Sequence, residues 1–116
     1  MVKVLMGWSD YHLHVFSVGR HRYADEFHRL EGTRPEHLTR LHQALPAPKA
    51  TISYVYDLGD CWRHEILLER VLDQHLPHPE CTAGQGDNPI EDYNPEFPEE
   101  PVPFDREVVN TALRRL

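Results

Sequence analysis

Residues 54–62 read Tyr54-Val55-Tyr56-Asp57-Leu58-Gly59-Asp60-Cys61-Trp62. The segments that contain and flank this stretch, 50–58 and 61–72, are rich in β-branched and aromatic residues, which predicts a β-hairpin. A three-residue loop over 58–60 puts every large apolar side chain on one face, because it pairs Tyr56 with Trp62, Tyr54 with His64 and Ile52 with Ile66. A two-residue turn at Leu58-Gly59 instead sets Asp57 opposite Asp60, an unfavourable pair of like charges. The pattern therefore favours the three-residue loop.

The N-terminal part of the chain predicts a helix end and two further strands. Residues 2–6 resemble the last turn of a helix that ends at Gly7, since glycine adopts a left-handed cap without strain. Apolar residues alternate with polar ones from His12 to Val18, which indicates a strand. A turn at Gly19-Arg20 then leads into a short strand over 21–23.

Two helices complete the predicted fold, one near 35–45 and one near 105–115. In the first, Thr33 or Arg34 lies near the cap and Pro35 in the first turn, and the stripe expected to be buried is Leu38, Leu41, His42 and Leu45. In the second, Asp105 is the expected cap, and the stripe is Val108 or Val109, Ala112, Leu113 and Leu116. We therefore expect an α+β fold, with these helices packed on a mainly antiparallel sheet that has the hairpin at its centre.

Length and charge limit the possible functions. A chain of 116 residues is the usual size of one domain, so we expect a single domain over 1–116. Residues 71–105 contain nine acidic residues and no Lys or Arg, and within them 77–104 form a proline-rich acidic segment that predicts a surface loop. The net charge of −7 argues against a nucleic-acid partner.

The cellular location is expected to be the cytoplasm. No run approaches the ~20 apolar residues of a membrane helix, and the first residues lack the pattern of a secretory signal. The two cysteines, Cys61 and Cys81, form no CxxC pair, so we expect reduced thiols with no disulfide framework.

Nine histidines suggest a divalent metal such as zinc as one interpretation. His12 and His14 are two positions apart and share a face if they lie in a strand; with His64 they are the candidate metal ligands. Further ligands could come from Asp57, Asp60 and Cys81. The structural alternative is that His12 and His14 bond to neighbouring strands, that His64 packs beside Tyr54, and that no cofactor is needed.

The two turn aspartates have two interpretations. Neighbouring carboxylates such as Asp57 and Asp60 can perform acid–base chemistry or hold a hard cation. Alternatively, they cap their own backbone while Gly59 supplies the special dihedral. The candidate functional cluster is His12, His14, Asp57, Asp60 and His64. The large aromatic residues, among them Trp8, Tyr54, Tyr56 and Trp62, are predicted to be core.

Four blocks of sequence resemble the plasmid pRiA4b ORF-3-like family. They are the stretch from Met6 to Phe16, the stretch from Tyr54 to Ile66, the pair Pro79-x-Cys81-x-x-Gly84 and Pro89-x-Glu91-Asp92, and Phe104-Asp105-x-x-x-Val109-Asn110-x-x-Leu113. In the family, two strands and most of a helix precede the first block. The resemblance implies that this copy is truncated or that its start is misassigned. Without those strands a sheet edge or a core face is expected to be uncovered, so that the chain pairs with itself or is marginally stable.

The resemblance implies a fold and a setting on plasmids or insertion elements, but no reaction. Two hypotheses follow. The favoured one is a non-enzymatic interaction or accessory protein that binds a protein partner or itself. The alternative is a small metal-dependent enzyme that uses the candidate cluster. No phosphate-binding loop, serine elbow or HExxH motif occurs in the sequence.

Overall fold

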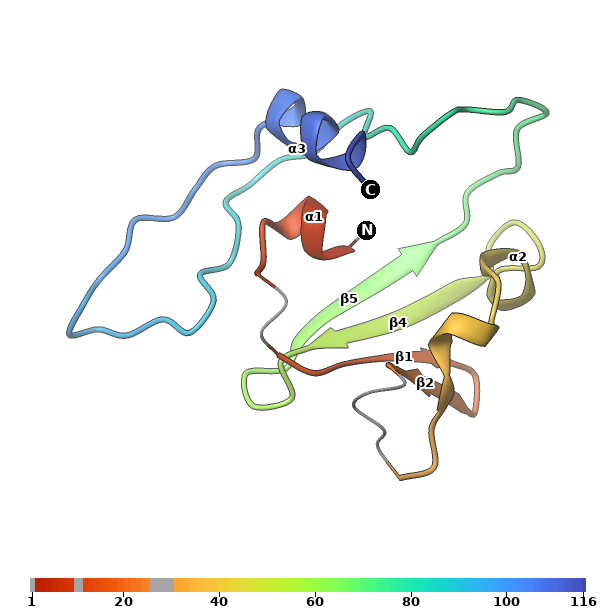
Figure 1. The fold of residues 1–116 in the computed structure, drawn as a ribbon, viewed down its shortest axis with the longest axis horizontal. Coiled ribbons are helices and arrows are strands. Elements are labelled where there is room, and N and C mark those ends of the chain that lie inside the picture. Colours follow the sequence, from red (N-terminus) through yellow and green to blue (C-terminus); the bar gives the residue numbers. More distant parts are fainter. Residues whose placement is uncertain (1, 10–11, 26–30) are drawn as a thin grey trace. The chain divides into compact units, whose positions relative to one another are not determined.

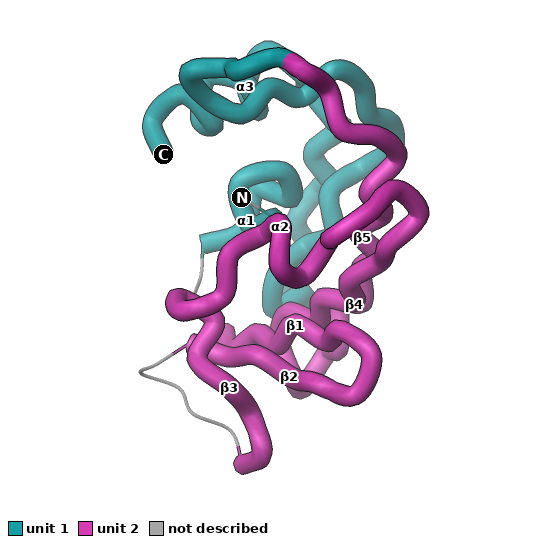
Figure 2. The backbone as a smooth tube through the Cα atoms, turned by 90° about the vertical axis from the view of Figure 1, so that its right-hand side faces the viewer, with its two compact units in different colours: residues 1–10, 74–116 teal, residues 11–73 magenta. Residues whose placement is uncertain are grey.

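The computed structural model describes residues 2–9, 12–25 and 31–116, which form two compact units. One unit comprises residues 1–10 and 74–116 and contains the helices α1 (Val2–Met6) and α3 (Arg106–Leu113). The other comprises residues 11–73 and contains all five strands (Figure 2). The single domain expected from the chain length stays a prediction. None of the described helices is long and apolar enough to cross a membrane.

The described strands form one mixed, mostly antiparallel sheet in the order β3-β2-β1-β4-β5 (Figure 1). The strands are β1 (His14–Val18), β2 (His21–Ala24), β3 (Arg34–Pro35), β4 (Thr51–Tyr56) and β5 (Trp62–Leu67). Only the pair β2–β3 is parallel. The α+β class is thus confirmed, but the hairpin β4–β5 lies at one side of the sheet and β1 occupies the middle position.

The register of the hairpin is the predicted one. Tyr56 pairs with Trp62, and the ladder continues through the expected pairs to Thr51 and Leu67. The second strand was expected to reach residue 72 but ends at Leu67. Its partner β4 begins at Thr51, opposite Leu67, and Lys49 just before it has a φ of +74°, so the partner chain is no longer extended there. Between β1 and β2, Gly19 makes the expected turn with a φ of +56°.

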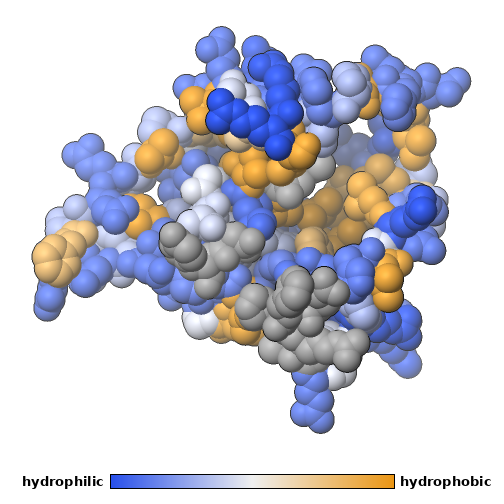
Figure 3. Space-filling model, in the orientation of Figure 1, coloured by the Kyte–Doolittle hydropathy of each residue, from blue (hydrophilic) through white to orange (hydrophobic). Residues whose placement is uncertain are grey.

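The core of the sheet lies on the face that β4 fills with large side chains. Ile52, Tyr54 and Tyr56 alternate with exposed or half-exposed neighbours, and Tyr56 is completely buried. Figure 3 shows hydrophobic residues grouped over β4 and β5, whereas hydrophilic residues cover most of the rest of that view. The period of two in the sequence therefore decides which face packs.

Helical residues lie in the segment 35–45 as expected, but they do not form one continuous helix. A 3₁₀ turn, η1 (Glu36–Leu38), and a four-residue helix, α2 (Leu41–Ala44), replace it. Thr39 and Arg40 are extended and interrupt the helix, and Pro35 belongs to β3, so neither Thr33 nor Arg34 caps a helix.

The buried stripe expected in this segment is correspondingly reduced. Leu45 is buried, but Leu38 and Leu41 are 71% and 66% exposed. The interruption at residues 39–40 prevents the three leucines from forming one continuous helical stripe.

The unit of residues 1–10 and 74–116 has the expected helix ends. Gly7 has a φ of +71° after α1, and the Asp105 carboxylate accepts hydrogen bonds from the backbone N–H groups of Glu107 and Val108 at the start of α3. Val109 and Leu113 form the buried stripe of α3, whereas Leu116 was expected to be buried and is exposed beyond the helix end. Within this unit α3 contacts α1; its packing on the sheet stays a prediction.

Candidate functional site

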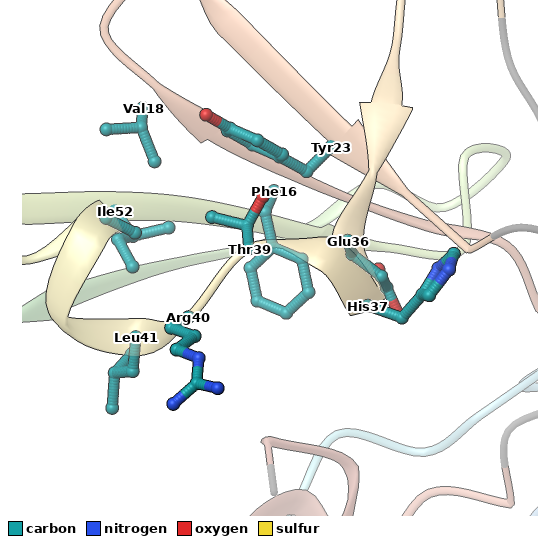
Figure 4. Close-up of a pocket in the computed structure, with 10 residues that line it drawn as sticks. Phe16, Val18, Tyr23, Glu36, His37, Thr39, Arg40, Leu41 and Ile52 are labelled. Atoms are coloured by element: carbon teal, nitrogen blue, oxygen red, sulfur yellow. The ribbon is translucent and has the colours of Figure 1, made fainter.

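A pocket of about 310 Å³ lies between the apolar face of the sheet and the segment 36–44 (Figure 4). Its floor comes from β1, β2 and β4 and consists of Phe16, Val18, Tyr23 and Ile52. The segment above supplies Glu36, His37, Thr39, Arg40, Leu41 and Ala44. The volume is at the low end of the roughly 300–1,000 Å³ of ligand pockets, and such pockets combine apolar walls with a few polar groups in the same way.

The shape of the pocket follows from the interrupted helix. The backbone N–H of Thr39 bonds to the Glu36 carbonyl at 3.1 Å and closes η1 after one turn. The side chain of Gln43 then accepts a hydrogen bond from the backbone N–H of Arg40 at 2.8 Å, which starts α2. A continuous helix would have buried its apolar stripe against the sheet. The extended link at residues 39–40 leaves a gap instead, and the gap is the pocket.

One polar contact ties this segment to the sheet. His14 Nε2 lies 2.6 Å from Glu36 Oε2, with the two side chains 10% and 26% exposed. Since an ionised carboxylate only accepts hydrogen bonds, the ring N–H of His14 is the donor. The contact fixes the first residue of η1 to the middle strand, at one end of the pocket.

Tyr54 is the centre of a cluster of rings on the same face. Its ring centroid is 4.8 Å from that of Phe16, 5.6 Å from that of His14 and 5.5 Å from that of His64. Separations of this size are typical of favourable aromatic pairs. The expected packing of His64 beside Tyr54 is confirmed.

The hairpin loop is organised around Asp57, which is only 8% exposed. Its Oδ1 accepts hydrogen bonds from the backbone N–H groups of Gly59, at 3.1 Å, and Asp60, at 3.3 Å. The positive φ values of the loop belong to Asp57 and Cys61, at +59° and +56°, and not to Gly59 as expected. Aspartate tolerates this conformation because its short side chain bonds locally. Asp57 thus acts in the structure as the cap of its own loop.

The candidate cluster does not converge on one point. His12 Nε2 lies 3.7 Å from Asp57 Oδ2, whereas His14 bonds to Glu36 and His64 packs on Tyr54. Among the residues that the structure describes, no group of three potential ligand atoms includes His14 or His64. Asp60 is exposed and contacts Asp57 through its backbone. The condition that both histidines lie in the strand is not met, because β1 begins only at His14. The ring of His12 nevertheless packs edge-on against Tyr56, the cross-strand partner of His14, with 5.7 Å between the ring centroids.

The first and third sequence blocks meet in the unit of residues 1–10 and 74–116. The indole N–H of the buried Trp8 donates to the Pro89 carbonyl at 3.2 Å. Both the backbone N–H and the hydroxyl of Ser9 donate to Glu91 Oε2, at 3.1 and 2.7 Å. Residues of the first and third sequence blocks are therefore bonded to each other within this unit.

The sequence did not reveal the pocket residues. Leu41 was expected to be part of a core, and Glu36, Arg40 and Tyr23 were not predicted to belong to a site. No local signal marked the interruption, because Pro35 is compatible with the start of a regular helix.

The sheet, the interrupted segment above it and the apolar pocket define a small α+β protein with a mixed, mostly antiparallel sheet. The chain belongs to the plasmid pRiA4b ORF-3-like protein family, whose sequence model matches residues 1–97. A crystal structure of a protein of unknown function from Methanosarcina mazei Go1 is similar to it, with a TM-score of 0.62 and 26% sequence identity over 78% of this chain. The match spans 54% of that protein, so this chain corresponds to about half of its length. No curated protein matches the sequence.

Proposed function

We propose that this protein is a non-enzymatic accessory protein of plasmids or mobile elements, and that its pocket binds an apolar segment of a protein partner. The observation that carries the proposal is the pocket of about 310 Å³ with two exposed leucines, Leu38 and Leu41, on the segment that forms its upper wall. The plasmid setting comes from the family to which the chain belongs.

The chemistry of the pocket favours an apolar occupant. Phe16, Val18 and Ile52 offer aromatic and aliphatic floor atoms, which gain from contact with another apolar side chain. Interfaces concentrate their binding energy where a large side chain enters such a pocket and neighbouring contacts exclude water. Leu41 lies both in the pocket wall and on the surface, so it can contribute to both.

The polar groups of the pocket support binding more than catalysis. An active site needs a nucleophile or base within hydrogen-bond reach of its partner and room for a reacting atom. Here the carboxylate of Glu36, which lines the pocket, is engaged with His14 and ties the segment to the sheet. The polar side chains of Thr39 and Arg40 complete the wall and can orient a bound chain.

Peptide display against the purified protein tests the proposal. The affinity of selected peptides is then measured by fluorescence anisotropy on the wild type and on two variants. Ala44→Trp fills the pocket and Leu41→Asp places a charge at its wall, so each is expected to weaken binding about tenfold or more. Val71→Asp is the matched control, since Val71 is 74% exposed and lies outside the pocket; this change is expected to leave the affinity unchanged.

Three outcomes would contradict the proposal. They are the selection of no peptide, equal binding by the pocket variants and the wild type, and a stoichiometric metal. The last is measured in protein purified without an affinity tag, followed by thermal shifts with Zn²⁺, Mn²⁺ and chelator. A bound metal that His64→Ala removes would support the metal-dependent enzyme instead.

A further inference from the structure

We propose that β5 pairs with β5 of a second copy of this chain, in an antiparallel register centred on His64. This inference does not depend on the pocket. It starts from the position of β5 at the edge of the sheet, where its only strand partner among the described residues is β4. Edge strands offer unpaired backbone groups to another chain.

The hydrogen-bond pattern shows which groups point outward. The backbone N–H of Leu68 bonds to the Ala50 carbonyl, in register with the β4–β5 ladder. Because bonded and non-bonded pairs alternate in an antiparallel ladder, the bonded pairs of β5 involve its even-numbered residues. The N–H and C=O groups of Arg63, Glu65 and Leu67 therefore point away from β4, toward the open edge.

The charges on this edge select one register. With His64 opposite His64 of the second copy, Arg63 lies opposite Glu65 of the second copy, and the same pair recurs by symmetry. A register centred on Arg63 sets two arginines opposite each other, and one centred on Glu65 sets two glutamates opposite each other. Opposite charges across strands stabilise and like charges destabilise, so of these three registers the His64-centred one is self-complementary.

The other face of the strand agrees with the same register. The His64-centred register places Trp62 opposite Ile66 of the second copy, and the same pair recurs by symmetry. Aromatic residues pair favourably with β-branched ones across strands. In the single chain both residues are half-buried and so retain surface for this contact. Charges on an edge strand usually prevent self-pairing. Here Arg63 and Glu65, whose backbone groups both point to the open edge, carry opposite charges, and this allows self-pairing in one register.

Charge reversal tests the register. Arg63→Glu alone and Glu65→Arg alone each create two like-charge pairs, and each is expected to weaken dimerisation about tenfold or more in analytical ultracentrifugation. The double variant Arg63→Glu/Glu65→Arg restores both pairs and is expected to recover the wild-type dimer. An equal mixture of the two single variants is expected to form a heterodimer, because each supplies the charges that the other lacks.

The substitutions leave the fold of the single chain intact. Arg63 and Glu65 are exposed and lie opposite Val55 and Ser53 in the β4–β5 ladder, so neither loses a charged partner across the strands. Glu69→Arg and Arg70→Glu, just beyond β5, are the matched controls with the same charge changes. Both are expected to dimerise like the wild type.

Hydrogen exchange gives a second measurement. Raising the protein concentration is expected to protect the amides of Arg63 and Glu65, which point to the open edge. A wild type that remains monomeric at its solubility limit would overturn the proposal. So would unchanged dimerisation in Arg63→Glu, failure of the double variant to recover the dimer, or edge amides that stay unprotected in the dimer.

Discussion

The imidazole of His14 and the carboxylate of Glu36 are in hydrogen-bond contact, 2.6 Å apart, across 22 positions of sequence. This contact joins the middle strand of the sheet to the first residue of η1, which also lines the pocket. It explains how so short a segment, with exposed leucines and little apolar burial of its own, keeps a defined position over the sheet.

Glu36→Ala is expected to lower the free energy of unfolding by about 1–2 kcal/mol, because it removes a hydrogen bond to a charged group at a partly buried site. Glu36→Gln keeps an acceptor oxygen and is expected to recover part of the loss. Urea denaturation of these variants and of His14→Ala forms a double-mutant cycle. The cycle subtracts the ring contacts that His14 makes with Phe16 and Tyr54. A coupling energy near zero would show that the contact does not hold the segment.

Three substitutions of Asp57 are expected to differ in stability, because the residue both accepts hydrogen bonds from the loop and adopts a positive φ. Asp57→Asn keeps an acceptor for the loop amides and tolerates the positive φ, so it is expected to be nearly neutral. Asp57→Gly loses the acceptor but tolerates the φ. Asp57→Ala loses both and is expected to cost about 1–3 kcal/mol. Thermal unfolding monitored by circular dichroism measures the order, and an alanine variant as stable as the asparagine variant would contradict the capping role.

Most of the sheet could be predicted from the sequence, because apolar and polar side chains alternate along a strand and this alternation can be read directly. Ile52, Tyr54 and Tyr56 are expected to share a face, and the like charges of Asp57 and Asp60 disfavour the shorter turn. The outcome is the predicted register in full. The cap at Asp105 was predictable for a similar reason, since it acts on amides two and three positions away.

The pocket was not predictable, because it depends on contacts between residues distant in sequence. The spacing of Leu38, Leu41 and Leu45 fits a regular helix, and nothing local shows that Thr39 becomes extended with a φ of −109°. The hydrogen bond that His14 donates to Glu36 ties the segment to the sheet, and only the folded sheet places His14 within reach. The distances between the candidate histidines could not be predicted for the same reason, because they depend on which strand or loop each histidine occupies in the folded chain.

Asn110 is expected to hold the residues around Cys81 against α3. Its side-chain oxygen accepts from the Cys81 backbone N–H at 2.7 Å, and its amide donates to the Cys81 carbonyl at 3.0 Å. Asn110→Ala leaves both backbone groups without these bonds and is expected to raise the rate at which a thiol reagent labels Cys81. Asn110→Asp keeps only the acceptor and is expected to be intermediate. The rates are measured in a Cys61→Ala background, because Cys61 is exposed and reacts on its own.

Gly84 is required by the ring of Phe104 and not by its own backbone dihedrals. A Cβ atom added at Gly84 would lie 2.6–2.7 Å from three ring carbons of Phe104, well inside van der Waals contact, and Gly84 is not among the glycines with positive φ. Gly84→Ala is therefore expected to displace the ring and to cost about 1–3 kcal/mol through overpacking. Phe104→Ala removes the obstacle, so adding Gly84→Ala in that background should cost nothing further in urea denaturation. If Gly84→Ala were equally destabilising with and without the ring, the glycine would be needed for a backbone reason that its φ does not indicate.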